Sequence, residues 1–171
     1  MKTKTIISTL IVIFFIVGLY VWGYSTKGGT ANSVQDTPTL NISNGSLVAA
    51  EKFYDFGAIS MKNGEVAKEF TITNPNDGDI ILSKVLTSCM CTNAYIVRPD
   101  GSMKGPFGMA GHGAAPSTDE IIKSRESRII RVVFDPNAHG PAGVGNIDRF
   151  ISLTDTSGNT LQLEIKALVT P

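Results

Sequence analysis

The chain has 171 residues, a formal net charge of zero and a pI near 6.7. It has room for one ordinary domain plus a shorter segment, and it lacks the basic excess with which nucleic-acid-binding domains contact phosphates. Only 18% of the residues are charged and glycine occurs 17 times, which favours a loop-rich β protein over a helical one. Two cysteines are too few for a fold built on disulfides.

Residues 1–24 are predicted to form an N-terminal membrane anchor. Lys2 and Lys4 precede Ile6–Tyr24, an uncharged apolar run with aromatic residues at its far end. As a helix, its roughly 19 residues would extend about 28 Å, close to the thickness of the hydrocarbon core. The lysines indicate a cytoplasmic N-terminus, so a single-pass protein of the cell membrane is expected, with its C-terminal domain outside the cytoplasm. The alternative is a cleaved signal peptide, although the run is long for one and lacks an Ala-x-Ala site.

The rest of the chain divides into a linker and one domain. Residues 25–45 are mostly Gly, Ser, Thr, Asn and Asp with little to bury, and they are expected to be a flexible linker. Residues 46–171 contain short runs with period two, separated by turn residues, and no convincing amphipathic helix. The number and spacing of these runs predict an all-β fold, an Ig-like β-sandwich of about seven strands. The runs are Ser46–Ala50, Val66–Ile72, Ile80–Leu86, Asn93–Val97, Arg128–Phe134, Ile147–Leu153 and Leu161–Val169.

Both cysteines lie in the short stretch Ser88–Thr92, with only Met90 between them. If the stretch is extended, Cys89 and Cys91 point to one face while Met90 points to the other, and Met90 contributes only if the stretch bends. Two residues of strand advance about 6.6 Å, which lets two sulfurs share a metal ion and is near the upper limit for an unstrained disulfide. The pattern therefore favours a cysteine pair that binds a ligand over a disulfide that stabilises the fold.

Four motifs along the domain resemble those of the DUF1573 family. They are Phe53–Ile59 (FYDFGAI), Phe70–Asn74 (FTITN), Ser88–Thr92 (SCMCT) and Phe134–Pro136 (FDP). The family has FDFG-x-I, F-x-x-x-N, SCGCT and FDP in the same order, so the resemblance covers roughly residues 49–169. It implies an Ig-like fold of unknown function in exported bacterial proteins, and it implies no catalytic residues.

The chain departs from the family pattern in two places. Met90 stands where the family usually has glycine, and residues 100–123 form a longer connection than is typical. This connection is glycine-rich and contains Met103, Met109 and His112, and it can fold back over the cysteines.

The residues near the cysteine pair suggest a soft-metal site. Thiolates and thioethers select soft ions, above all Cu(I), and imidazole suits copper and zinc. A bound Cu(I) would also protect thiols that otherwise oxidise outside the cytoplasm. The preferred hypothesis is therefore a membrane-anchored, non-enzymatic binding module with a Cu(I) site. Its expected ligands are Cys89, Cys91, Met103, Met109 and His112.

Two other classes of function stay open. Cys89 and Cys91 can cycle between dithiol and disulfide in an exported redox protein. Alternatively, they only pack beneath a loop, in a domain that binds a protein partner through its sheet edges. His139, in the loop after the FDP motif, is expected to be a loop residue rather than a ligand. No catalytic triad, close carboxylate pair or phosphate-binding loop is recognisable, so the sequence predicts no enzyme.

Overall fold

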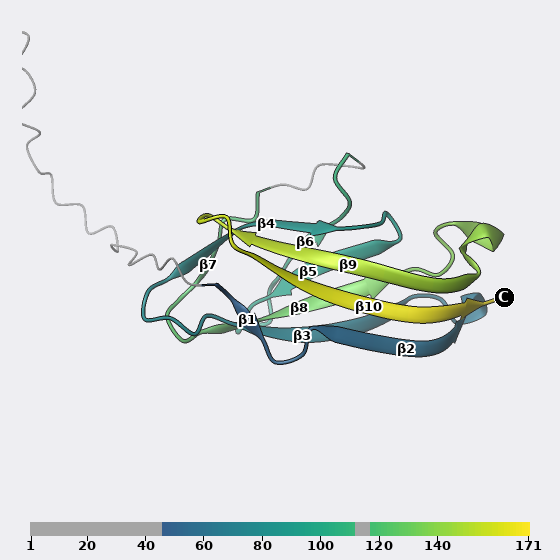
Figure 1. Cartoon of the computed structure of the whole chain (residues 1–171), viewed down its shortest axis with the longest axis horizontal. Coiled ribbons are helices and arrows are strands. Elements are labelled where there is room, and N and C mark those ends of the chain that lie inside the picture. The colour runs from purple at the N-terminus through teal and green to yellow at the C-terminus, as the bar shows by residue number, and fades with distance from the viewer. Residues whose placement is uncertain (1–45, 112–116) are drawn as a thin grey trace, which may run out of the picture. The chain divides into compact units, whose positions relative to one another are not determined.

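The computed structural model describes residues 46–111 and 117–171, which form two five-stranded β-sheets (Figure 1). The first sheet contains, in spatial order, β1 (Val48–Ala49), β3 (Val66–Thr73), β8 (Ser127–Phe134), β5 (Thr92–Val97) and β6 (Met103–Phe107). The second contains β2 (Phe53–Ser60), β10 (Thr160–Thr170), β9 (Gly145–Asp155), β4 (Ile80–Thr87) and β7 (Glu120–Ile122). Two short 3-10 helices, η1 (Met61–Asn63) and η2 (Gly140–Gly143), complete the elements of the described residues.

The all-β, two-sheet prediction is confirmed, and the Ig-like arrangement of the strands stays a prediction. Within the described residues no helix has the length and apolarity needed to cross a membrane. The predicted anchor (residues 1–24) and linker (residues 25–45) lie outside the described residues.

Alternating side chains form the core between the two sheets. In β10, for example, Leu161, Leu163 and Ile165 are buried while the residues between them face outward, as the period-two pattern predicts. The buried hydrophobic side chains of the first sheet are Phe70, Ile72, Ala94, Ile96, Phe107, Ile130, Val132 and Phe134. Those of the second sheet include Ile80, Leu82, Val85, Ile151, Leu153, Leu163, Ile165, Ala167 and Val169. The hairpin between β9 and β10 also forms as expected, since Gly158 donates its backbone N–H to the Asp155 carbonyl.

The structure has more strands than the seven expected, because three strands bury only one or two residues each. β2 pairs parallel to β10 as an edge strand, and Ile59 is its one buried residue. β6 and β7 lie within the long connection that was expected to be a loop. In β6, Gly105 has a φ of +141°, and a Cβ there would lie 2.9 Å from the Ala94 carbonyl oxygen. Glycine at this position therefore allows β6 to approach β5 closely, and it does not mark a flexible loop.

A β-bulge in β4 decides which residues face the core at the end of the strand. Ile80 and Leu82 are buried at even positions, but the pairing with β9 shifts register between Leu82 and Lys84. After the shift, Val85 and Thr87 are the buried residues. One extra residue in a strand reverses which side chains face inward, so the bulge places the Thr87 hydroxyl inside the protein.

A buried carboxylate joins the two sheets at the opposite end of β5 from the cysteines. Glu120 on β7 accepts from Arg98 Nη2 at 2.6 Å and from Arg128 Nε, on β8, at 3.0 Å. Glu120 and Arg128 are almost fully buried, with 4% and 7% exposure. Burial alone would raise the pKa of Glu120, but the hydrogen bonds and charges of Arg98 and Arg128 outweigh it, and the pKa is lowered from its usual 4.5. The charge cluster therefore stabilises the ionised form of the Glu120 carboxylate.

We expect Glu120→Gln to destabilise the domain by about 3 kcal/mol, because Arg98 and Arg128 lose their buried counter-charge and only Arg128 keeps a second carboxylate, that of Glu126 at 2.8 Å. Since the folded pKa of Glu120 lies below its unfolded value, its contribution is complete above pH 4.5 and is lost as pH falls through the folded pKa. Urea unfolding over a range of acidic pH should show a steeper loss for the wild type than for Glu120→Gln. Glu69→Gln, which breaks the exposed pair with Arg131, is the control and should cost less than about 0.5 kcal/mol. Equal effects of the two variants would contradict the buried-cluster interpretation.

Candidate functional site

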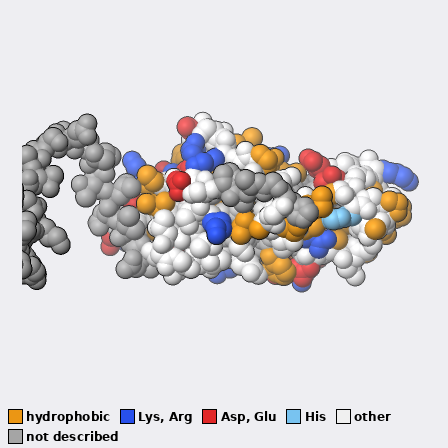
Figure 2. Space-filling model, turned by 90° about the horizontal axis from the view of Figure 1, so that it is seen from above, with side chains coloured by type: hydrophobic (Ala, Val, Ile, Leu, Met, Phe, Trp, Pro, Cys, Tyr) orange, Lys and Arg blue, Asp and Glu red, His pale blue; other side chains and the backbone are white. Residues whose placement is uncertain are grey.

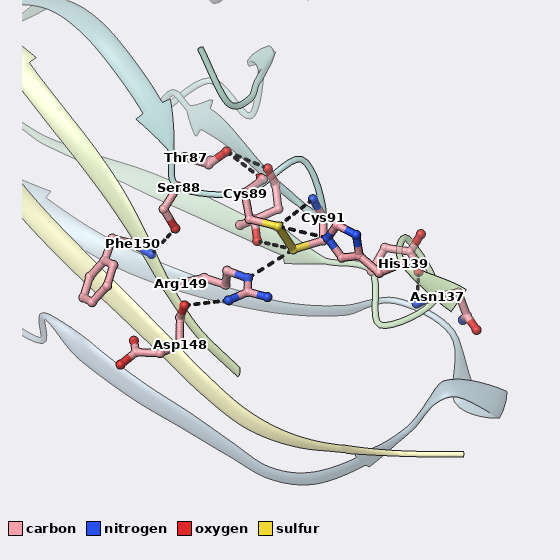
Figure 3. The surroundings of a disulfide bond; sticks show 11 residues. Thr87, Ser88, Cys89, Cys91, Asn137, His139, Asp148, Arg149 and Phe150 are labelled. Carbon is pink, nitrogen blue, oxygen red and sulfur yellow. Dashed lines mark hydrogen bonds between the residues drawn. A yellow bond between two sulfur atoms is a disulfide. The ribbon is translucent and has the colours of Figure 1, made fainter. Parts of the chain in front are cut away.

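The two cysteines lie in a turn between β4 and β5 and not in a strand. The Thr92 backbone N–H donates to the Cys89 carbonyl at 3.1 Å, and the Cα atoms of Cys89 and Cys91 are 5.3 Å apart. The expectation of an extended stretch was therefore wrong, because the chain reverses here to pass from one sheet to the other. The shorter Cα separation lies well inside the range that suits a disulfide, and the two sulfurs form one (Figure 3). Met90 lies at the tip of the turn and is 52% exposed.

Thr87 holds this turn from the inside. Its hydroxyl lies within hydrogen-bond distance of two carbonyl oxygens, that of Cys89 at 3.0 Å and that of Thr92 at 2.9 Å. Thr87 and Thr92 are 4% and 0% exposed, so the hydroxyl and the Thr92 carbonyl have little access to water. A buried carbonyl without a donor is costly, and the inward-facing hydroxyl therefore stabilises the turn geometry.

Ser88 brings Arg149 to the disulfide. The backbone N–H of Ser88 donates to the Phe150 carbonyl, and the backbone N–H of Phe150 donates to Ser88 Oγ, both at 2.9 Å. These bonds continue the pairing of β4 with β9 by one residue, so Arg149 on β9 lies beside the turn. Its Nε donates to Cys91 Sγ at 3.2 Å (Figure 3).

The loop after β8 brings His139 to the other sulfur. The Asp135 backbone N–H donates to the Cys91 carbonyl at 2.9 Å, which ties this loop to the cysteine turn. The Asp135 carboxylate then accepts from the Asn137 backbone N–H at 2.8 Å and bends the loop back. As a result, His139 Nε2 lies 3.2 Å from Cys89 Sγ (Figure 3).

The two sulfurs therefore have different environments. Cys91 is 1% exposed and faces a guanidinium, whereas Cys89 is half-buried and faces the imidazole of the exposed His139. Figure 2 shows the imidazole at the protein surface, with hydrophobic side chains beside it. A molecule from solution can therefore approach the pair from the Cys89 side.

This arrangement can carry out two kinds of chemistry. A cation beside sulfur stabilises the thiolate, which is the reactive form in disulfide exchange. The same sulfurs, together with an imidazole nitrogen, are ligands for soft metal ions. Cys89 Sγ, Cys91 Sγ and a ring nitrogen of His139 all lie within 4.8 Å of one another.

The structure brings only part of the expected ligand set together. Met103 is 61% exposed and pairs with Val97, six residues of strand or about 20 Å from Cys91, so the structure does not bring it to the cysteine pair. Met109 is half-buried, and its backbone forms a bridge with that of Thr87 close to the cysteine turn. His112 lies outside the described residues.

Sequence reasoning missed both nitrogen partners of the disulfide. His139 was interpreted as an ordinary loop residue, and Arg149 was not considered. A signal for His139 was present, since it follows the FDP motif by only three residues. That motif and the cysteine motif are in contact through Asp135 and Cys91. For Arg149 no local signal exists, because its position depends on the register between β4 and β9.

A separate surface recess runs along β2, β9 and β10. It is lined by residues that include Asp55, Asp148 and Lys166, and it contains none of the disulfide residues or their nitrogen partners. Its charged groups already have partners, since Lys166 Nζ lies 3.5 Å from Asp148 and 2.9 Å from Glu164 outside the recess, and the Asp55 carboxylate accepts from the Gly57 N–H at 2.8 Å. The disulfide turn therefore remains the candidate site.

Comparison with known proteins agrees with the family resemblance. Residues 47–101 match the family model DUF1573, described as a protein of unknown function, and this confirms the resemblance over those residues. No curated protein matches the sequence.

Among solved structures, the chain is similar to a protein of unknown function from Porphyromonas gingivalis W83. The TM-score is 0.52 at 18% identity, over 78% of this chain and 51% of that one. It is also similar to a family 123 glycoside hydrolase from Clostridium perfringens, with a TM-score of 0.50 at 7% identity, over 70% of this chain and 23% of the other. The chain thus spans about half the length of the first protein and about a quarter of the second. At these identities the likeness shows the fold alone.

Thr87→Val should destabilise the domain by about 1–3 kcal/mol, because it keeps the shape of the side chain but removes the hydroxyl that donates to the buried Thr92 carbonyl. Chemical denaturation of the oxidised protein measures the difference. Thr71→Val, on an outward-facing position of β3, is the matched control and should change stability by less than about 0.5 kcal/mol. If both variants behave alike, the hydroxyl does not hold the turn.

Proposed function

We propose that this chain, which carries the DUF1573 family segment over residues 47–101, exchanges electrons with partner thiols through the Cys89–Cys91 disulfide. One observation carries the proposal: each sulfur of the pair has its own nitrogen partner at 3.2 Å, His139 for Cys89 and Arg149 for Cys91. A disulfide that served only to stabilise the fold would need neither the imidazole nor the guanidinium. It would also close a loop of just three residues, and such a short loop constrains the unfolded chain very little.

The difference in burial assigns a role to each cysteine. A partner thiolate attacks Cys89 Sγ, because Cys91 is 1% exposed and cannot be reached. A new sulfur–sulfur bond forms between the partner and Cys89, the Cys89–Cys91 bond breaks, and Cys91 leaves as a thiolate beside the Arg149 guanidinium. A second partner thiolate then attacks the mixed disulfide and leaves with the first as the partner's disulfide. Cys89 takes up a proton, for which the imidazole of His139 is the adjacent carrier.

The electrostatics of the site favour the reduced state of the pair. The guanidinium stabilises the Cys91 thiolate, and a stabilised reduced form makes a dithiol–disulfide pair a better oxidant. We therefore propose that the pair accepts two electrons from a partner dithiol rather than donating them. The exchange is stoichiometric, so the proposal remains within the non-enzymatic class expected from the sequence.

We further propose that the domain works outside the cytoplasm, held at the membrane by residues 1–24 through the linker 25–45. The apolar run Ile6–Tyr24 and the lysines before it support this, as does the presence of a disulfide, which persists in oxidising compartments. Labelling the reduced cysteines in intact cells with a membrane-impermeant maleimide reports on which side of the membrane the domain lies.

The two single-cysteine variants should react very differently with oxidised glutathione. Cys91→Ser leaves the accessible Cys89 thiol and should accumulate a glutathione adduct. Cys89→Ser leaves only the buried Cys91 and should react at least tenfold more slowly. Intact-mass spectrometry follows the adduct, and the reduced wild type should pass through it to the internal disulfide. Equal rates would contradict the assignment of Cys89 as the exchanging sulfur, and a wild-type disulfide that reduced glutathione or dithiothreitol cannot open would contradict the proposed function.

Replacing the cation beside Cys91 should make the pair a weaker oxidant. Arg149→Gln removes a charge-assisted hydrogen bond to the thiolate, worth about 1.5 kcal/mol or more. The dithiol–disulfide equilibrium in a glutathione buffer should therefore shift about tenfold toward the disulfide, measured by alkylation and mass analysis. Arg131→Gln, at an exposed position on β8 next to Glu69, is the matched control and should leave the equilibrium unchanged. An unchanged equilibrium in Arg149→Gln would show that Arg149 has only a packing role.

A further inference from the structure

Reduction of the disulfide would leave three metal-binding atoms close together. Cys89 Sγ, Cys91 Sγ and a ring nitrogen of His139 lie within 4.8 Å of one another, and Cys89 Sγ is 3.2 Å from His139 Nε2. Ligand atoms about 2.0–2.3 Å from a shared ion lie about 3.5–4 Å from each other. Side-chain rotations that move the three atoms by roughly 1 Å would therefore suffice to enclose a metal ion.

The backbone holds the two loops in the right place for this without the sulfur–sulfur bond. Thr87 fixes the cysteine turn through two carbonyl groups, and the Asp135 N–H holds the His139 loop to the Cys91 carbonyl at 2.9 Å. None of these bonds involves a sulfur atom, so the three donors should stay together in the reduced protein.

The donor set selects a soft ion. Two thiolates and one imidazole suit Cu(I) or zinc, and three donors suit Cu(I) in particular, since structural zinc sites almost always use four. Among the described His, Cys, Asp and Glu side chains, no fourth member joins the group. Two thiolates around Cu(I) carry one net negative charge, and the Arg149 guanidinium, 3.2 Å from Cys91 Sγ, compensates it.

We infer that reduction converts the disulfide into a Cu(I) site whose ligands are Cys89, Cys91 and His139. The inference rests on the proposed function in one respect, because it needs the pair to be reducible; the two electrons come from partner thiols, as in the exchange step. The disulfide form cannot hold the ion in this way, since metal binding requires thiolates. Redox state thus decides whether the site exists. His139 supplies the third donor, whereas Met103 lies at the far end of β5.

The test is an anaerobic competition between the full chain and the coloured Cu(I) complex of bicinchoninate. The chain is first reduced with a phosphine and desalted, and alkylation of a sample counts its free thiols. The reduced wild type should withdraw one equivalent of Cu(I), and the untreated disulfide form none. Cys89→Ser and Cys91→Ser should abolish binding at the same chelator concentration. His139→Asn should weaken it at least tenfold, while Met90→Leu, which removes the exposed thioether between the cysteines, should bind like the wild type.

Each outcome separates the inference from the proposed function. Two free thiols without copper binding would overturn the inference and leave the redox function standing. A pair that no thiol reductant opens would overturn the redox function, and copper binding can then still be tested after phosphine reduction. Unchanged affinity in His139→Asn, or equal binding by the disulfide form, would overturn the assigned site. Circular dichroism of each variant distinguishes loss of binding from loss of folding, and the near-ultraviolet absorption of Cu(I)–thiolate bonds gives an independent readout.

Discussion

The geometry of the site depends on one buried hydroxyl group. Thr87 faces inward because of the bulge in β4, and its hydroxyl satisfies the carbonyl groups on either side of the cysteine turn. The Cys89 carbonyl also accepts from the Thr92 N–H, but without the hydroxyl the buried Thr92 carbonyl would need water and the turn would have to open. Within this turn, the Cys91 carbonyl accepts a hydrogen bond from the loop after β8, and Ser88 forms hydrogen bonds with β9. Hydrogen bonds that involve no sulfur atom therefore place both His139 and Arg149 next to the disulfide.

Two functions that looked like alternatives in the sequence become two states of one site in the structure. The oxidised pair is a disulfide whose accessible half is Cys89, and the reduced pair is a set of soft donors next to an imidazole. The guanidinium of Arg149 has the same physical effect in both states, because it stabilises negative charge on Cys91 whether that thiolate is free or bound to a metal. A single arrangement of charges thus supports exchange and metal binding without additional residues.

The fold separates the site from the part of the domain that carries its buried charges. β5 runs from the cysteine turn at Thr92 to Val97, just before Arg98 in the Glu120 cluster. The cluster links the two sheets at one end, and the disulfide turn links them at the other. Since about 20 Å of strand lies between them, changes in the charge cluster should affect the stability of the domain without changing the environment of the sulfurs.

The sequence by itself determined the all-β class, most of the central strands and the identity of the cysteine pair. Alternation along β8, β9 and β10 is a local pattern, and so is the turn after Asp155, so both can be recognised without the fold. The edge strands β2, β6 and β7 could not, because each buries only one or two side chains and leaves little periodicity to detect.

Only the tertiary structure decided which residues surround the cysteines. The partners lie 50 residues from Cys89 and 58 residues from Cys91, and both contacts depend on strand register and loop docking. Register depends on the bulge in β4, which one extra residue creates and which no sequence period reveals. The sequence suggested the methionines of the long connection as ligands because thioethers are soft donors. Strand pairing, however, places Met103 at the far end of β5. A histidine from the loop after β8 and an arginine from β9 lie next to the sulfurs instead.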